Sequence, residues 1–133
     1  MSNYERVLYV SHEINPYLPE NYMSYMGRQL PQEAQDFGKE IRLFMPRFGC
    51  VNERRHQLHE VIRLSGMNLI VDDTDHPLII KVASIQPTRM QVYFIDNEEF
   101  FRRKATFWDS EDDFFEDNDE RSIFFSRGVF ETV

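Results

Sequence analysis

The chain has 133 residues, of which 41% are hydrophobic, and its formal net charge is −8 at pH 7. This suits one globular domain with a real core and is too short for two, and the apolar fraction argues against general disorder. The acidic balance argues against a nucleic-acid partner, which needs a basic face, and the sequence shows no polybasic, signal-peptide or membrane-spanning segment. We therefore expect a soluble cytoplasmic protein that binds neither nucleic acid nor a membrane.

The first fifty residues predict a strand, a loop, a helix and a second strand. The continuous apolar run 7–11 is typical of a strand buried on both faces of a parallel sheet, and 41–45 is a second such run. Between them, residues 24–37 predict a helix that Gly38 ends in a left-handed conformation. The apolar positions expected on its buried face are Met26, Leu30, Ala34 and Phe37. This pattern predicts two parallel strands joined by a right-handed crossover.

Short apolar runs further along predict a meander of strands. They are residues 61–64, 67–71, 78–85 and 90–95. The dipeptide Ser65-Gly66 is a candidate hairpin turn between the first two runs, and residues 72–77 predict a polar turn before the third. The polar stretch 52–58 is compatible with a helix, and residues 86–89 interrupt the last two strands.

Two helices are predicted in the last third of the chain. The first is short, spans residues 96–103 and is capped by Asp96 or Asn97, with carboxylates in its first turn. An acidic stretch, 109–120, leads into the second helix from about Asp119. We expect its core-facing side chains to be Ile123, Phe124 and Phe130.

Two places near the carboxyl ends of the predicted parallel strands are candidate binding sites. Ligands of open α/β sheets bind at this edge, and the first helix begins there with free backbone amides. His12 and Glu13 follow the first strand, so they either bind a ligand or stabilise the loop. Arg47 follows the second strand, where it either meets an anion or pairs with a carboxylate.

Other clusters of polar residues favour ordinary surface roles over chemistry. His56, His59 and Glu60 form no complete metal-ligand set, and Asp72, Asp73, Asp75 and His76 lack the spacing of a calcium loop. The acidic segment 111–120 could pair carboxylates or attract a basic partner, but charge runs are more often solvated. Cys50 stands alone, without an assignable base. We therefore predict no metal, no cofactor and no catalytic residue.

Four segments resemble one known family in the order that the family has them. Residues 7–17, VLYVSHEINPY, are similar to the opening V-L-x-V-S-S-E-x-x-P-F of bacterial glycogen synthases and plant starch synthases. Residues 27–49 are similar to G-A-L-P-x-A-L-x-x-x-G-H-x-V-R-V-x-x-P-x-Y-G. Residues 92–103, VYFIDNEEFFRR, and 117–131, DNDERSIFFSRGVFE, resemble V-Y-F-I-D-x-P-x-Y-F-x-R and D-N-x-x-R-F-x-F-F-S-R-A-x-x-E.

This resemblance implies an α/β fold with a Rossmann-like open sheet, mostly parallel with a β-hairpin or meander insertion. Such a sheet is part of the amino-terminal half of a GT-B glycosyltransferase, in which ADP-glucose and an α-1,4-glucan meet between two halves. The nucleotide is held mainly by the other half. Residues 1–133 are then a single, incomplete amino-terminal domain that stops before the family's histidine motif. Its expected partners are an α-glucan or a sugar nucleotide, with His12, Glu13 and Asn15 as tentative substrate-binding positions.

The family's donor-phosphate loop, K-T-G-G-L, is altered in this chain. The aligned residues are Pro19, Glu20, Asn21, Tyr22 and Met23. The lysine is lost and both glycines are replaced, which removes the cation and the close backbone approach that phosphates require. The family's next aspartate aligns with Tyr25, and an active-site tyrosine aligns with Phe107 or Trp108. We therefore expect the isolated chain to be inactive as a glycosyltransferase.

Two other functions remain open from the sequence. The chain could be a non-catalytic glucan-binding or regulatory module that retains the scaffold without the donor loop. It could also be an unrelated small α/β binding protein, in which case its fold would not resemble half of a glycosyltransferase.

Overall fold

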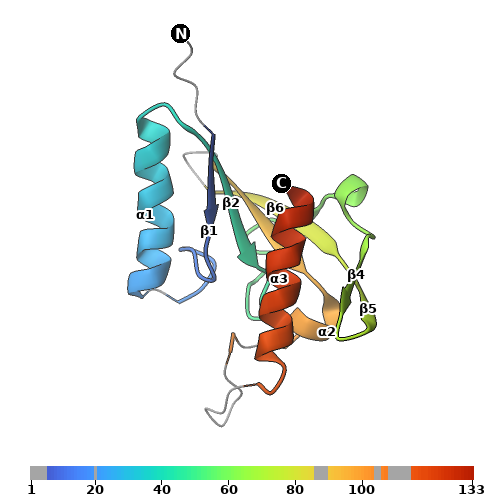
Figure 1. Cartoon of the computed structure of the whole chain (residues 1–133). Helices are drawn as coiled ribbons and strands as arrows, with labels where there is room; N and C mark the ends of the chain where they lie inside the picture. The colour runs from blue at the N-terminus through green and yellow to red at the C-terminus, as the bar shows by residue number, and fades with distance from the viewer. Residues whose placement is uncertain (1–5, 20, 86–89, 104–105, 108–114) are drawn as a thin grey trace.

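The structure, a computed structural model, describes the chain except residues 1–5, 20, 86–89, 104–105 and 108–114. A five-stranded sheet is flanked by two long helices, α1 (Tyr22–Asp36) and α3 (Asn118–Thr132) (Figure 1). The strands in spatial order are β1 (Arg6–Val10), β2 (Glu40–Pro46), β7 (Met90–Asp96), β6 (Ile79–Ile85) and β3 (His59–Glu60). Strands β1, β2 and β7 pair in parallel, and β6 pairs antiparallel with β7 on one side and with β3 on the other. This architecture confirms the predicted Rossmann-like open sheet.

The two helices lie on opposite faces of the sheet. Neighbouring residues of a strand point to opposite faces, and on β7 the ring of Phe94 contacts Tyr17 of the loop before α1. The next residue, Ile95, meets α3 at Gly128, where an added Cβ would lie 2.7 Å from the Ile95 side chain. Gly128 is thus the point of close approach between α3 and the sheet. The sheet is covered in the manner of a doubly wound domain.

Helix α1 buries a different face from the predicted one. Leu30 is 43% and Phe37 84% exposed, whereas the buried residues are Ser24, Gly27 and Pro31. Small residues lie inward because the helix packs directly on the preceding loop. A Cβ at Gly27 would lie only 2.6 Å from the carbonyl oxygen of Glu13. The end of the helix was predicted correctly, since Gly38 follows it with φ +84°.

Helix α3 also differs from its predicted packing. Phe124 is fully buried as expected, but Ile123 is 49% and Phe130 79% exposed. The buried side of α3 consists of Arg121, Phe124, Phe125, Gly128 and Val129. Residues 123 and 130 are two turns apart on the opposite side of the same helix, so the sheet cannot cover both them and Phe124.

The predicted hairpin turn at Ser65-Gly66 is wrong. Residues 62–64 form the 3₁₀ helix η1 (Ile62–Leu64), and the hairpin is formed by β4 (Asn68–Val71) and β5 (Thr74–Pro77). Its turn residues, Asp72 and Asp73, have φ values of 51° and 61°, a left-handed conformation that aspartate tolerates. The stretch 52–58 forms turns and not a helix.

The remaining predictions mostly hold. The strands predicted at 78–85 and 90–95 are confirmed as β6 and β7, and α2 (Glu98–Phe101) is capped by Asn97, whose Oδ1 accepts from the backbone of Glu99 and Phe100. The interrupting residues 86–89 lie outside the described part of the chain. Burial of β1 on both faces is wrong, because Leu8 and Val10 are 47% and 46% exposed.

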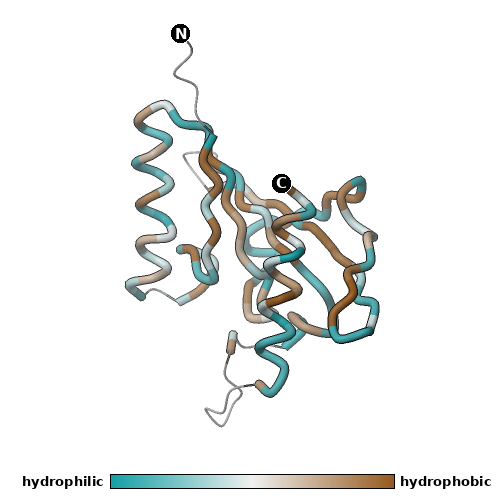
Figure 2. The backbone as a smooth tube through the Cα atoms, viewed as in Figure 1, coloured by the Kyte–Doolittle hydropathy of each residue, from teal (hydrophilic) through white to brown (hydrophobic). Residues whose placement is uncertain are grey.

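The core is continuous across the central strands. It includes Leu43 and Met45 of β2 and Val92 and Phe94 of β7, none of them exposed. Figure 2 shows hydrophobic stretches along the strands, with hydrophilic residues alternating around both long helices. Among the described residues, no helix is both long and apolar enough to cross a membrane.

Candidate functional site

The loop between β1 and α1 brings Glu13 and Asn21 together, although eight residues separate them. The Nδ2 of Asn21 donates to both carboxylate oxygens of Glu13, at 3.1 and 3.2 Å. Asn21 is also the residue that caps α1. A negative charge of the chain itself is therefore fixed beside the amino-terminal end of this helix, where the helix dipole favours an anion.

The first turn of α1 is closed by a capping box between Asn21 and Ser24. The backbone N–H of Ser24 donates to Asn21 Oδ1 at 2.8 Å, and the backbone N–H of Asn21 donates to Ser24 Oγ at 2.9 Å. Ser24 is fully buried. Backbone donors that could otherwise approach a phosphate are satisfied by side chains here.

The other positions of the altered loop offer no obvious anion contacts. Tyr22 is 79% and Met23 50% exposed, and Tyr25, which follows the capping serine, is 46% exposed. Pro19 is exposed, and its carbonyl oxygen accepts from Ser24 Oγ at 3.3 Å. Glu20 lies outside the described residues. The described part of this loop thus contributes no cation to the start of α1.

His12 follows β1, but its side chain does not join the contact between Glu13 and Asn21. Its ring contacts Phe107 and Phe125, with centroid distances of 5.2 and 5.7 Å. Burial lowers the pKa of His12, partly offset by the Glu13 carboxylate, so the imidazole is neutral at pH 7. The cavity beside it has a volume of about 10 Å³, enough for one water at most.

Two further positions near this loop are Asn15 and Phe107, the latter aligned with the family's active-site tyrosine. Asn15 is half-buried, and its backbone N–H donates to the carbonyl of Ser24 at 3.0 Å. Phe107 packs on His12 and, at 5.3 Å between ring centroids, on Phe48. Trp108 lies outside the described residues. Of the three tentative substrate-binding residues, Glu13 contacts the helix cap, while His12 faces α3.

Arg47 pairs with a carboxylate, which settles the choice left open by the sequence. Its Nη2 lies 3.0 Å from Asp96 Oδ1, and Lys81 Nζ lies 2.8 Å from Asp96 Oδ2. Lys81 also contacts Glu53. Burial tends to lower the pKa of Lys81, but hydrogen bonds to Asp96 and Glu53 raise it overall. The signal for this network in the sequence is weak and consists of charged residues inside otherwise apolar strands.

The clusters considered for metals are dispersed. His56 lies in a turn with its ring against Tyr17, His59 begins β3, and His76 is buried with Nδ1 3.1 Å from Glu99 Oε2. Within the described ranges, no group of three or more His, Cys, Asp or Glu side chains could hold a metal ion.

The acidic segment is only partly visible, because residues 108–114 lie outside the described part. Its end has a structural partner, since Asp117 Oδ2 accepts from Arg103 Nη2 at 2.7 Å. This contact holds the pKa of Asp117 below its ordinary value. At least this carboxylate therefore serves to attach the segment to the fold.

Comparison with known proteins gives one consistent relationship. A family model described as the starch synthase catalytic domain matches residues 6–133. A glycogen synthase of Chlorobaculum tepidum is 37% identical over 129 residues, covering 96% of this chain and 26% of the relative. A glycogen synthase of Chlorobium limicola is 35% identical over 129 residues, with the same coverage.

Solved structures show the same fold. The catalytic domain of starch synthase IV from Arabidopsis thaliana, solved bound to ADP and acarbose, superposes with a TM-score of 0.77 at 17% identity. The superposition covers 96% of this chain and 24% of that one. An unrelated small α/β binding protein is thereby set aside. The chain spans about a quarter of the length of the curated relatives it matches, and it belongs to the starch synthase catalytic domain family.

Proposed function

We propose that residues 1–133 form the first part of the amino-terminal domain of a glycogen or starch synthase-type glycosyltransferase whose donor-phosphate loop is closed. In the proposed role the chain supplies part of the scaffold and the side of the site that binds the acceptor glucan. It does not itself transfer glucose from ADP-glucose to an α-1,4-glucan. The observation that carries this proposal is the contact of Asn21 with both oxygens of Glu13 at the start of α1.

Electrostatics explains why this contact opposes donor binding. Two like unit charges 4 Å apart repel by about 4 kcal/mol at an effective dielectric constant of 20. The family motif also has a glutamate at the position of Glu13, but here Pro19 replaces the lysine that would offset its charge. A pyrophosphate at the start of α1 would therefore meet the Glu13 carboxylate without that cation, and the capping box leaves it fewer backbone donors. Glycines and a lysine at these positions would reverse both effects.

Restoring the family's loop is expected to create ADP binding without creating catalysis. The variant carries Pro19→Lys, Glu20→Thr, Asn21→Gly, Tyr22→Gly and Met23→Leu. We expect it to bind ADP at least about 10-fold more tightly than the natural sequence in isothermal titration calorimetry, because one added cation contact contributes about 1.5 kcal/mol. Neither protein should incorporate labelled glucose from ADP-glucose into glycogen.

A matched control variant separates the effect of the added positive charge on ADP binding from the effect of losing the capping box. Pro19→Lys with Glu20→Thr retains Asn21 and the capping box, so it should gain less affinity than the five-residue variant. Circular dichroism checks folding, since loss of the cap costs about 1 kcal/mol. Glucose incorporation by the natural sequence would contradict the proposal, as would equal ADP affinity of the natural and restored loops.

The acceptor side is proposed at the half-buried polar residues that follow β1. These are His12, Glu13 and Asn15. Glu13→Ala is expected to weaken binding of maltoheptaose about 10-fold, because a charged hydrogen bond to a sugar hydroxyl contributes about 1.5 kcal/mol. Glu33→Ala, an exposed acid further along α1, is the matched control. Absence of maltoheptaose binding, or equal affinity of the two variants, rules this site out.

A further inference from the structure

The altered loop brings two exposed tyrosines to positions where the family motif has a glycine and an aspartate. Tyr22 is 79% and Tyr25 46% exposed, and both lie in the first turn of α1. Side chains three residues apart on a helix are neighbours, with their Cβ atoms about 5–6 Å apart. In the described part of the chain, neither hydroxyl makes a hydrogen bond and neither ring contacts another ring. The described contacts therefore give no structural reason for either ring.

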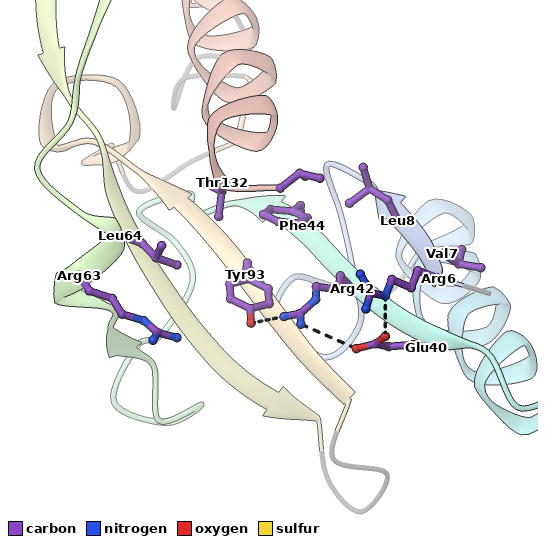
Figure 3. A pocket seen from close by; sticks show the side chains of 11 residues that line it. Arg6, Val7, Leu8, Glu40, Arg42, Phe44, Arg63, Leu64, Tyr93 and Thr132 are labelled. Carbon is purple, nitrogen blue, oxygen red and sulfur yellow. Dashed lines mark hydrogen bonds and ion pairs between the residues drawn. The ribbon is translucent and has the colours of Figure 1, made fainter. Parts of the chain in front are cut away.

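A tyrosine that the fold uses has different surroundings. Tyr93 lines a cavity of about 550 Å³ beside the end of α3, and its hydroxyl accepts from Arg42 Nη1 at 2.7 Å (Figure 3). Its ring stacks on Phe44, with 5.3 Å between the ring centroids. Both the hydroxyl and the ring of Tyr93 thus have partners within the fold. Tyr22 and Tyr25 present the same chemical groups to solvent.

Hydrogen-bonding groups adjoin the two exposed rings. Asn21 caps the helix that Tyr22 begins, and the backbone N–H of Tyr25 donates to Asn21 O at 2.9 Å. The side chain of Asn21 holds the Glu13 carboxylate at 3.1 and 3.2 Å. A carboxylate has about four acceptor positions, so Glu13 can also accept from the hydroxyls of a ligand. The start of α1 therefore combines aromatic surface with a fixed acceptor.

This combination suits a neutral ligand that is rich in hydroxyls. The C–H groups on one face of a sugar ring form an apolar surface that packs on an aromatic ring, and the hydroxyls donate to a carboxylate. Tyrosine supplies such a surface at a low cost in side-chain entropy. A phosphorylated ligand fits poorly, because its charge would meet Glu13 and the described part of the loop contributes no cation. An adenine base that carries phosphates is disfavoured for the same reason.

We propose that Tyr22 and Tyr25 form a stacking platform for the glucose units of an α-1,4-glucan. The segment that lacks the family's phosphate-binding residues is then a subsite for the sugar polymer. The platform adjoins Glu13, and one glucan chain contacts both. This inference rests on the proposed acceptor role of the chain and identifies the aromatic side chains that hold the glucan.

Titration with maltoheptaose in isothermal titration calorimetry tests the platform. Tyr22→Ala with Tyr25→Ala is expected to weaken binding at least about 10-fold, because both stacking contacts are lost. Tyr22→Phe with Tyr25→Phe should bind within about 3-fold of the natural sequence, since phenylalanine retains the ring. Phe37→Ala is the matched control, because it removes an 84% exposed ring at the other end of the same helix. Circular dichroism checks that each variant is folded.

NMR of the tyrosine rings shows where the sugar binds. The ring signals of Tyr22 and Tyr25, assigned from the single alanine variants, should shift during the titration with maltoheptaose. The ring signals of Tyr93 should not shift, because its hydroxyl and its ring are already engaged within the fold. A general effect on folding would move all three sets of signals.

The outcomes that overturn the platform differ from those that overturn the closed donor loop. Equal maltoheptaose affinity of the double alanine variant and Phe37→Ala rules the platform out, as do unchanged ring signals of Tyr22 and Tyr25. Displacement of maltoheptaose by ADP also overturns it, since the rings then hold a nucleotide. If Glu13→Ala weakens binding and the tyrosine changes do not, the platform is wrong and the proposed acceptor side remains. Glucose transfer enters none of these measurements.

Discussion

Replacing Arg121 by alanine is expected to lower the free energy of unfolding by about 3–5 kcal/mol, measured by urea denaturation. Arg121 is 1% exposed, and its Nε and Nη1 donate to the carbonyls of Phe100 and Thr106 at 2.8 and 2.7 Å. Alanine would leave both carbonyls without this donor and create a cavity among aromatic rings. Those within 6 Å of the guanidinium are Phe48, Phe101, Phe107 and Phe115.

Arg127→Ala is the matched control on the same helix. Arg127 makes one hydrogen bond, from Nη1 to Ile70 O, at an exposed position, so its loss should cost about 1 kcal/mol or less. Burial lowers the pKa of Arg121 to about 10, so the guanidinium is still charged at pH 7. Arg121→Lys should therefore recover little stability, because lysine retains the charge without the planar fork. Equal destabilisation by Arg121→Ala and Arg127→Ala would refute this role.

Asp96→Ala is expected to destabilise the fold by about 3–5 kcal/mol, because it leaves two neighbouring cations without their shared counterion. Asp96 is 1% exposed at the end of β7, between Arg47 at 3.0 Å and Lys81 at 2.8 Å. Thermal and urea denaturation at pH 7 measure the loss. Asp96→Asn should be milder, since the amide oxygen still accepts one hydrogen bond.

Asp36→Ala controls for the removal of a carboxylate as such. Asp36 is exposed at the end of α1, and its Oδ1 accepts from Gln32. We expect a change within about 0.5 kcal/mol. If Asp96→Ala and Asp36→Ala had similar effects, the buried network would not be a major source of stability.

The sequence predicted the strands better than it predicted which faces they bury. The run 90–95 became β7 because its residues are apolar on both faces of a central strand. The same reasoning failed for β1, where Leu8 and Val10 stay about half exposed at the end of the strand order. It failed for α1 as well, because packing on the loop at Glu13 requires Gly27 rather than Leu30. An apolar pattern predicts the type of secondary structure, but which residues are buried depends on the elements that pack against each face.

The sequence by itself determined the family, the strand and helix order, and the loss of the lysine and glycines at residues 19–23. These are properties of residue type and order. Only the tertiary structure decided that Asn21 holds Glu13 at the start of α1, that Arg47 pairs with Asp96, and that β1 is the outermost strand of the sheet in the described part of the chain. Each is a contact, or a missing one, between segments whose relative position depends on the path of the loops. That path is fixed by packing across the whole domain and is not encoded in any one segment.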